Sequence, residues 1–216
     1  MRTSFFSYLS TDPAYYAAAV LAIVLSITFH ELAHGWVAIK LGDRTPIETG
    51  HMTYNPLVHM GPFAIVAMLI AGIAWGQMPV DASRLRGKWA EAKVAFAGPA
   101  VNLMIALVSL VALGLWIRFG GLPGEDEFRV ENGQMVLRVF GVFNAILFVF
   151  NLLPVPPLDG SRILANANRD YARWAFDPAN SGPVLILFVV AWLGFAVFVP
   201  YVQLGAIRFA YAIGGI

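Results

Sequence analysis

The stretch SITFHELAHGWVAIKLG, residues 26–42, places two histidines and a glutamate inside a run that otherwise has the character of a membrane-spanning helix. The surrounding segment, residues 14–39, is nearly uncharged and long enough to cross ~30 Å of hydrocarbon at ~1.5 Å per residue. An acidic side chain at the centre of a membrane costs about 2.5–3.5 kcal/mol on insertion scales, and in most cases it marks a functional site. This stretch therefore predicts a bundle of membrane helices and a polar site within it.

The composition of the whole chain is that of an integral membrane protein. Of its 216 residues, 59% are hydrophobic and 12% are charged, with a mean hydropathy of +0.70. Ordinary soluble domains have roughly 45–50% apolar and about 25% charged residues. The net charge of +1 gives no electrostatic footprint for nucleic acid. Because the chain has no cysteine, disulfides and thiolate ligands are excluded, and any metal must be held by His, Asp or Glu.

The hydrophobic segments predict an all-α membrane protein, a polytopic helix bundle in one domain over residues 1–216. No internal repeat, low-complexity tract or linker interrupts the chain. We expect the segments at about 14–41, 61–75, 94–117, 137–153 and 183–213.

Four of these segments are expected to span the membrane. The segment 61–75 is short and is bracketed by Gly61-Pro62 and Gly76, which suits a re-entrant or half-inserted element. In the last segment, Pro200 predicts a kink or a split. The stretch IETGHMTYNP, Ile47–Pro56, could add a short membrane-associated β-hairpin.

Residues 30–34, HELAH, form the HExxH pattern. Helical residues four apart lie on one face, so His30 and His34 can present imidazole nitrogens to one Zn²⁺ while Glu31 reaches a water beside it. The alternative is a pair of histidines that only make hydrogen bonds, and it is weakened by the surrounding hydrocarbon.

Two histidines do not complete a catalytic zinc site, which ordinarily has three protein ligands. The best candidate for the third ligand is Asp159 in NLLPVPPLDG, residues 151–160, because its prolines prevent the preceding helix from continuing. A simple turn is the alternative interpretation of this motif.

With these motifs in place, the chain resembles the site-2 protease family of intramembrane zinc metalloproteases, peptidase family M50. HELAH, FAGPAVN (residues 96–102) and NLLPVPPLDG match three blocks of that family in order. The stretch GHMTYNPLVH, residues 50–59, is similar to its compact branch without a PDZ domain, and the connection 118–137 is too short to hold one.

The resemblance implies a function and a set of site residues. His30, His34 and Asp159 would be zinc ligands, Glu31 the catalytic base, and Asn151 a residue lining the cleft near substrate. The family cleaves transmembrane segments of other membrane proteins, so the expected partners are transmembrane protein substrates and the lipid bilayer. The sequence leaves the oligomeric state undefined.

The position of charges gives an orientation. If 61–75 does not span, residues 40–93 and 154–182 share one side of the membrane, which is the side of the expected site. The basic residues of this side are Lys40, Arg44, Arg84, Arg86, Lys88, Lys93, Arg162, Arg169 and Arg173. The opposite side has Arg2, Arg118, Arg129 and Arg138, accompanied by Glu125, Asp126, Glu127 and Glu131. The excess of basic residues makes the first side cytoplasmic, in what we expect to be a prokaryotic plasma membrane.

Several roles stay open on sequence alone. Asn151 could donate to an oxyanion or substrate backbone, or it could only cap its helix; Asn102 is interpreted as a helix-to-helix hydrogen-bonding residue. An exposed strand edge in 47–54 could hold an unwound substrate by β-augmentation, or this stretch could be a loop. His51 and His59 are expected to be hydrogen-bonded rather than ligands. The rival function is a divalent-cation transporter or metal-binding membrane protein that uses the same three ligands.

Overall fold

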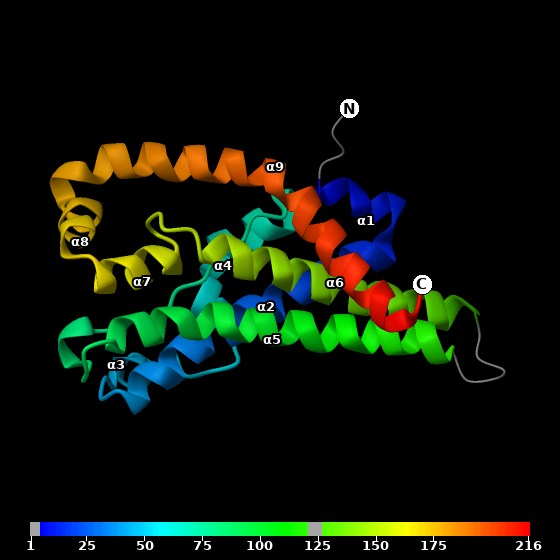
Figure 1. Cartoon of the computed structure of the whole chain (residues 1–216), viewed down its shortest axis with the longest axis horizontal. Coiled ribbons are helices and arrows are strands. Elements are labelled where there is room, and N and C mark those ends of the chain that lie inside the picture. Colours follow the sequence, from blue (N-terminus) through cyan, green and yellow to red (C-terminus); the bar gives the residue numbers. More distant parts are fainter. Residues whose placement is uncertain (1–4, 121–126) are drawn as a thin grey trace.

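The computed structural model describes residues 5–120 and 127–216, which are helical over most of their length (Figure 1). Residues Arg2, Glu125 and Asp126, which entered the charge argument, lie outside these ranges. The helices, in chain order, are η1 Phe5–Ser7, α1 Tyr8–Thr11, α2 Pro13–Lys40, α3 Thr45–Glu48, α4 Pro56–Ala71, η2 Ala82–Arg84, α5 Ala90–Phe119, α6 Glu127–Asn151, α7 Asp159–Ala167, α8 Arg169–Phe176, η3 Pro178–Asn180 and α9 Ser181–Gly214.

Four helices in the described part of the chain are long and apolar enough to cross a bilayer, as predicted. They are α2, α5, α6 from Val130 onward, and α9 together with the short helix before it. The start of α2 follows from its sequence, because Asp12 accepts a hydrogen bond from the Tyr15 amide and Pro13 occupies the first turn. The chain therefore has the architecture of a multi-pass membrane protein.

The fifth hydrophobic segment forms α4, which is too short to span. Its 16 residues are broken at Gly61, whose φ of 69° and ψ of 166° are not helical, directly before Pro62. The straight part after this kink measures only about 15 Å at ~1.5 Å per residue, half of the hydrocarbon thickness. As predicted, this segment is thus too short to span the membrane.

The hairpin considered for Ile47–Pro56 does not form, since the structure assigns no strand in these residues. The chain here makes the end of α3 and a series of turns that lead into α4. The proline in the first turn of each helix explains this outcome: Pro46 favours α3, and Pro56 favours α4 with Asn55 capping the Leu57 amide. The residues that suggested hairpin turns are helix-start signals.

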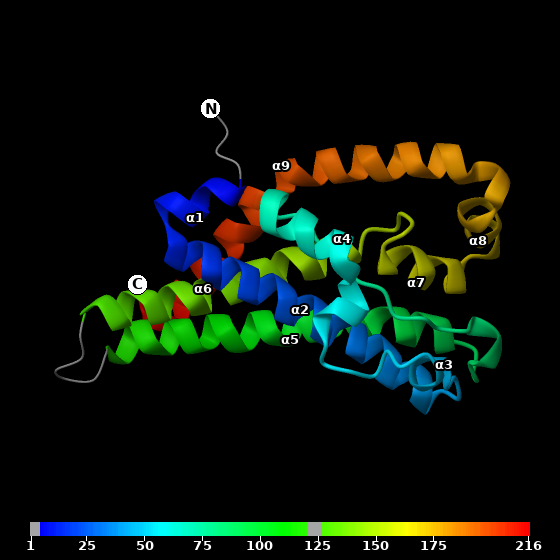
Figure 2. The same ribbon diagram turned by 180° about the vertical axis from the view of Figure 1, so that it is seen from behind.

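Helices α2, α5 and α6 pack together as the centre of the bundle. Figures 1 and 2 show α2 and α6 running in one direction and α5 in the other, so that the end of α2, the end of α6 and the start of α5 meet at the same end of the molecule. Helices α3, α7 and α8 lie at this end too. This arrangement brings the HELAH motif and the loop after α6 to the same depth.

Helix α9 lies at the periphery of the bundle. It is one continuous helix that contains Pro200, and Figure 1 shows that it changes direction along its length. The prediction of a kink is confirmed, and the helix is not split, because the assignment runs through Pro200 without a break. Most of its large apolar side chains face outward, as expected for contact with lipid.

Candidate metal centre

Helix α2 carries the first three candidate residues of the site. His30, Glu31 and His34 are all buried, and the ring centroids of the two histidines are 4.6 Å apart in an edge-to-face arrangement. The four-residue spacing puts both imidazoles on the same face of the helix, as the HExxH pattern predicts. These two rings therefore form one side of a polar centre inside the bundle.

Asp159 completes this centre from a distant part of the sequence. Helix α6 ends at Asn151, the proline-rich loop reverses the chain, and α7 begins at Asp159 itself. The Asp159 carboxylate lies with Oδ2 3.1 Å from His30 Nε2 and Oδ1 3.4 Å from His34 Nε2. The predicted set of two histidines and one aspartate is thus brought together.

The Nδ1 atoms of both histidines, on the far side of each ring from Asp159, make hydrogen bonds. His34 Nδ1 is 2.7 Å from the main-chain oxygen of Val94, and His30 Nδ1 is 2.6 Å from Oδ1 of Asn102. Because these oxygens can only accept, each Nδ1 must carry the proton and donate it. In the neutral rings, both Nε2 atoms then present lone pairs toward the Asp159 carboxylate.

This arrangement fits a metal cation. Three acceptor groups face one another, and their ligand atoms all lie within 4.8 Å of one another. Oδ2 of Asp159 is buried and has no hydrogen-bond partner among the described residues, so a cation would satisfy it. Gly98 of α5 leaves room beside both rings, because a Cβ at this position would fall onto the Nε2 atoms of His30 and His34. Two imidazoles and a carboxylate suit Zn²⁺, and a fourth position is left for a reactant.

Glu31 lies beside the three ligand candidates and is not one of that group. Its carboxylate is covered by Gly76, where an added Cβ would be 2.6 Å from Glu31 Oε1. Gly76 belongs to a segment without regular secondary structure, residues 73–81, between α4 and η2. The segment therefore fixes the space available to the Glu31 carboxylate.

A cavity of about 880 Å³ opens onto this centre. It is lined by His30, Glu31, His34 and Asp159, by the segment 73–80, and by an apolar wall from α9 that consists of Phe188, Trp192, Phe195, Ala196 and Val199. The volume falls in the upper part of the range of small-molecule sites, ~300–1,000 Å³. The centre is thus accessible to a ligand while it remains inside the bundle.

Asn151 also lines the cavity, and its side-chain amide donates to the main-chain oxygen of Leu147 at 3.0 Å. Its amide oxygen is not used in that bond. The position is compatible with both roles considered from the sequence, a substrate contact and a bond within its own helix.

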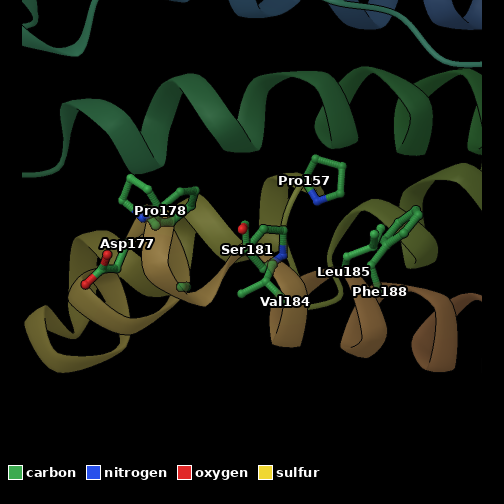
Figure 3. A pocket seen from close by; sticks show the side chains of 10 residues that line it. Pro157, Asp177, Pro178, Ser181, Val184, Leu185 and Phe188 are labelled. Atoms are coloured by element: carbon green, nitrogen blue, oxygen red, sulfur yellow. The ribbon is translucent and has the colours of Figure 1, made fainter.

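A second, smaller cavity of about 320 Å³ adjoins the first where α9 begins. Figure 3 shows it between the loop after α6 and the region from Asp177 to Phe188. Pro157 and Phe188, both labelled there, line the two cavities. The apolar wall of the main cavity is thus continuous with a pocket at the end of the bundle.

Two features of the site escaped the sequence interpretation. The irregular backbone that lines the cavity lies in 73–80 and not in 47–54, and Gly76 was its one local signal. Asn144 of α6 was not singled out, although it bonds to Asn102. Asn102 itself connects helices as expected, and His51 and His59 lie outside the metal-ligand group, with His59 Nε2 2.7 Å from the Thr53 oxygen.

Comparison with known proteins agrees with this geometry. The profile of peptidase family M50 matches residues 18–120 and 125–190. The chain is 34% identical to a Bacillus subtilis protein named "Putative zinc metalloprotease YwhC", over 79% of this chain and 78% of that protein. It is 28% identical to "Zinc metalloprotease MJ0392" of Methanocaldococcus jannaschii, over 82% of this chain and 42% of that protein.

No solved structure gives a significant match. The family profile nevertheless covers most of the chain, including α2, α5 and the loop that carries Asp159. The resemblance to the site-2 proteases is therefore confirmed, and this multi-pass membrane protein belongs to peptidase family M50.

Proposed function

We propose that this zinc-dependent metalloprotease hydrolyses peptide bonds within or near the transmembrane segments of other membrane proteins. The observation that carries the proposal is the convergence of His30, His34 and Asp159 beside Glu31, inside a bundle of membrane helices. A protease centre at this depth can meet substrates that a soluble enzyme cannot reach. By the same proposal, the whole chain from α2 to α9 acts as one catalytic domain, because the cavity is lined by both helices.

In this proposal, His30 and His34 bind zinc through Nε2 and Asp159 binds it through its carboxylate. When bound there, zinc would supply Lewis acidity for a scissile carbonyl and would lower the pKa of a water molecule. The hydrogen bonds at the two Nδ1 atoms hold both imidazoles in the tautomer that this binding requires.

Glu31 is the proposed general base. Its carboxylate takes a proton from the attacking water and delivers it to the leaving amine when the peptide bond breaks. Gly76 limits the positions open to this carboxylate, so the proton acceptor is held near the ligands. Asn151, which lines the cavity at the end of α6, is proposed to bind substrate.

A helical substrate must unwind before its carbonyls are exposed. The segment 73–80 has no regular secondary structure and lines the cavity, and its main chain is proposed to pair with the unwound peptide. In this proposal, the segment takes the role that we considered for a strand edge in 47–54.

The site is proposed to open toward the cytoplasm of a prokaryotic cell. The end of the bundle that carries α3, α7 and α8 is rich in arginine and lysine, which favours the cytoplasmic side. Relatives from a bacterium and an archaeon support a prokaryotic plasma membrane.

The decisive experiment compares the purified wild type with Glu31→Gln. Bound metal is measured for both, and cleavage is measured on a panel of single-pass membrane peptides in liposomes. We expect equal zinc content and a cleavage rate that falls about 10²–10⁴-fold, the usual contribution of a general base.

Metal-loaded wild type that cleaves nothing on a broad panel would contradict the proposal. Zinc flux across the liposome membrane that Glu31→Gln leaves unchanged would favour the transporter instead, because a transit site has no need of a proton-transferring glutamate.

A further inference from the structure

The interior of the bundle contains a continuous chain of buried side-chain hydrogen bonds that ends at His30. Ser26, Asn102 and Asn144 are fully buried, and they come from α2, α5 and α6. Asn102 Nδ2 donates to Asn144 Oδ1 at 2.8 Å, and Asn144 Nδ2 donates to Ser26 Oγ at 2.8 Å. Asn144 touches neither the ligand group nor the cavity.

The direction of this chain is set at one end by a main-chain carbonyl. Asn144 Nδ2 also donates to the oxygen of Phe140 at 2.9 Å. A carbonyl oxygen can only accept, so the amide nitrogen of Asn144 must face it and Oδ1 must face Asn102.

The same reasoning then fixes the next two groups. Because Asn144 Oδ1 can only accept, Asn102 must present its NH₂ group to it. The Oδ1 atom of Asn102 therefore faces His30. His30 must present Nδ1–H to that oxygen, which leaves the Nε2 lone pair directed at the site. His34 needs no such chain, because the main-chain oxygen of Val94 accepts directly from its Nδ1.

We infer that Asn144 is a positioning residue for metal binding, which acts through the amide of Asn102 on the tautomer and orientation of His30. Without the Asn144 acceptor, the Asn102 amide can turn over and present NH₂ to His30, which would favour protonation of Nε2 and block it as a ligand. This inference rests on the proposed function, since it takes His30 to bind zinc. Loss of an outer hydrogen-bond partner of a metal-binding histidine typically weakens metal affinity ~10–100-fold.

A simple structural role for Asn144 would have a different signature. A hydrogen bond between membrane helices contributes modestly to stability. Its loss would lower the unfolding temperature without a specific effect on zinc affinity. Zinc affinity and stability must therefore be measured on the same variants.

The test uses three variants of the full-length, detergent-solubilised protein. Asn144→Leu removes the acceptor with little change in volume. Asn144→Asp keeps an oxygen that accepts from Asn102, whether the carboxyl group is neutral or ionised. Thr28→Val is the matched control, because Thr28 is buried in α2 and bonds only within its own helix, to the Val24 oxygen at 2.8 Å.

Zinc affinity is measured by competition with a chelator, and the visible spectrum of the cobalt-substituted protein reports the geometry at the ligands. We expect Asn144→Leu to weaken zinc binding about tenfold or more and to alter the cobalt bands. Asn144→Asp and Thr28→Val are expected to stay within about threefold of wild type, well below that effect.

Wild-type zinc affinity in a folded Asn144→Leu protein would overturn the inference, and so would equal losses in the Leu and Asp variants. If Asn144→Leu does not fold, Asn144→Ala replaces it in the test. If neither of these variants folds while Asn144→Asp does, the residue is needed for folding alone, and the inference is overturned. His30→Ala separates the two proposals: unchanged zinc affinity in that variant would refute the ligand assignment itself.

Discussion

The three-helix interior and α9 meet the same cavity with opposite chemistry. In the most apolar 18-residue stretch of α2, 56% is buried inside the protein. The corresponding share is 11% in the span that contains α9. The interior contains most of the buried polar side chains of the described chain, including His30, Asn102 and Asn144, whereas α9 buries only Phe195, Ala206 and Ala210.

This difference indicates a division of labour. The hydrogen bonds of the interior orient the candidate ligands at the metal centre. Removal of one partner from such a network leaves a buried polar group without a hydrogen bond, which is costly. Helix α9 supplies an apolar wall, whose contribution is shape and hydrophobic contact. We expect substitutions in the interior to affect metal binding and substitutions in α9 to affect substrate binding, with a different magnitude in each case.

The largest effect is expected at Asp159, the candidate ligand whose carboxylate lies beside both histidines. Asp159→Ala removes the carboxylate that lies 3.1 Å and 3.4 Å from the two Nε2 atoms. Zinc affinity should fall by more than about 100-fold, above the range for outer partners, and proteolysis should be undetectable. Chelator competition and peptide cleavage measure the two effects.

The matched control is Asp170→Ala, because the Asp170 side chain is 92% exposed in α8. It should bind zinc and cleave substrate as the wild type does. Zinc affinity of Asp159→Ala within tenfold of the wild type would exclude Asp159 as a ligand.

The same substitution, glycine to alanine, can be made in the three-helix interior at Gly98 and in α9 at Gly194. In Gly98→Ala of α5, the new methyl group collides with the ligand atoms of both histidines, whereas nothing lies within 4 Å of a Cβ at Gly194 of α9. Overpacking costs ~1–3 kcal/mol, which corresponds to a loss of about 5- to 150-fold in zinc affinity when the histidines are displaced. Gly194→Ala should leave zinc affinity unchanged, and equal behaviour of the two variants would refute the division of labour.

The sequence predicts some parts of this site well because they are local. The spacing of His30 and His34 defines a helical face, and the prolines before Asp159 require the chain to leave α6. The short, glycine-bracketed segment around Gly61 likewise predicts that α4 cannot span.

Other parts depend on which helices become neighbours, and no local pattern contains that information. The bond from Asn144 to Asn102 joins residues 42 positions apart. The sequence therefore indicated that Asn102 connects helices, but it did not show that Asn144 is its partner. The stretch 47–56 misled for another reason: Pro46 and Asn55-Pro56 are turn residues in a strand interpretation and helix-start residues in the structure.

A smaller effect is expected on the α9 side of the cavity. Trp192→Ala removes an aromatic side chain from the wall, and partial loss of its contact with substrate should cost about 1.4 kcal/mol, or tenfold. Because the contact is equally present before and in the transition state, KM should rise while kcat and zinc affinity stay constant. Val190→Ala is the control, since Val190 is 60% exposed and does not line the cavity. A fall in zinc affinity in Trp192→Ala would show that α9 also shapes the metal centre.

The smallest effect is expected outside the cavity, at Asp43. Its carboxylate binds the end of the segment 73–81 through the Asp81 amide. Its buried carboxylate accepts from the hydroxyl and amide of Thr45 at 2.6 and 2.9 Å, and from the Asp81 amide at 2.8 Å. Burial alone would raise the pKa of Asp43, but these hydrogen bonds hold the pKa below its usual value. Because the folded pKa is depressed, the ionised carboxylate stabilises the protein above the usual aspartate pKa, ~4, and this stabilisation is lost as the pH falls through the folded value.

Asp43→Asn should therefore lower the free energy of unfolding at pH 7 by about 1–2 kcal/mol, with part of the hydrogen bonding retained by the amide oxygen. The difference from wild type should shrink in acid below the folded pKa, as measured by thermal unfolding in detergent across this range. Asp12→Asn is the control, because asparagine caps the start of α2 as well as aspartate does. A stability loss in Asp43→Asn that is independent of pH would mean that the shape of the side chain, and not its charge, anchors the segment.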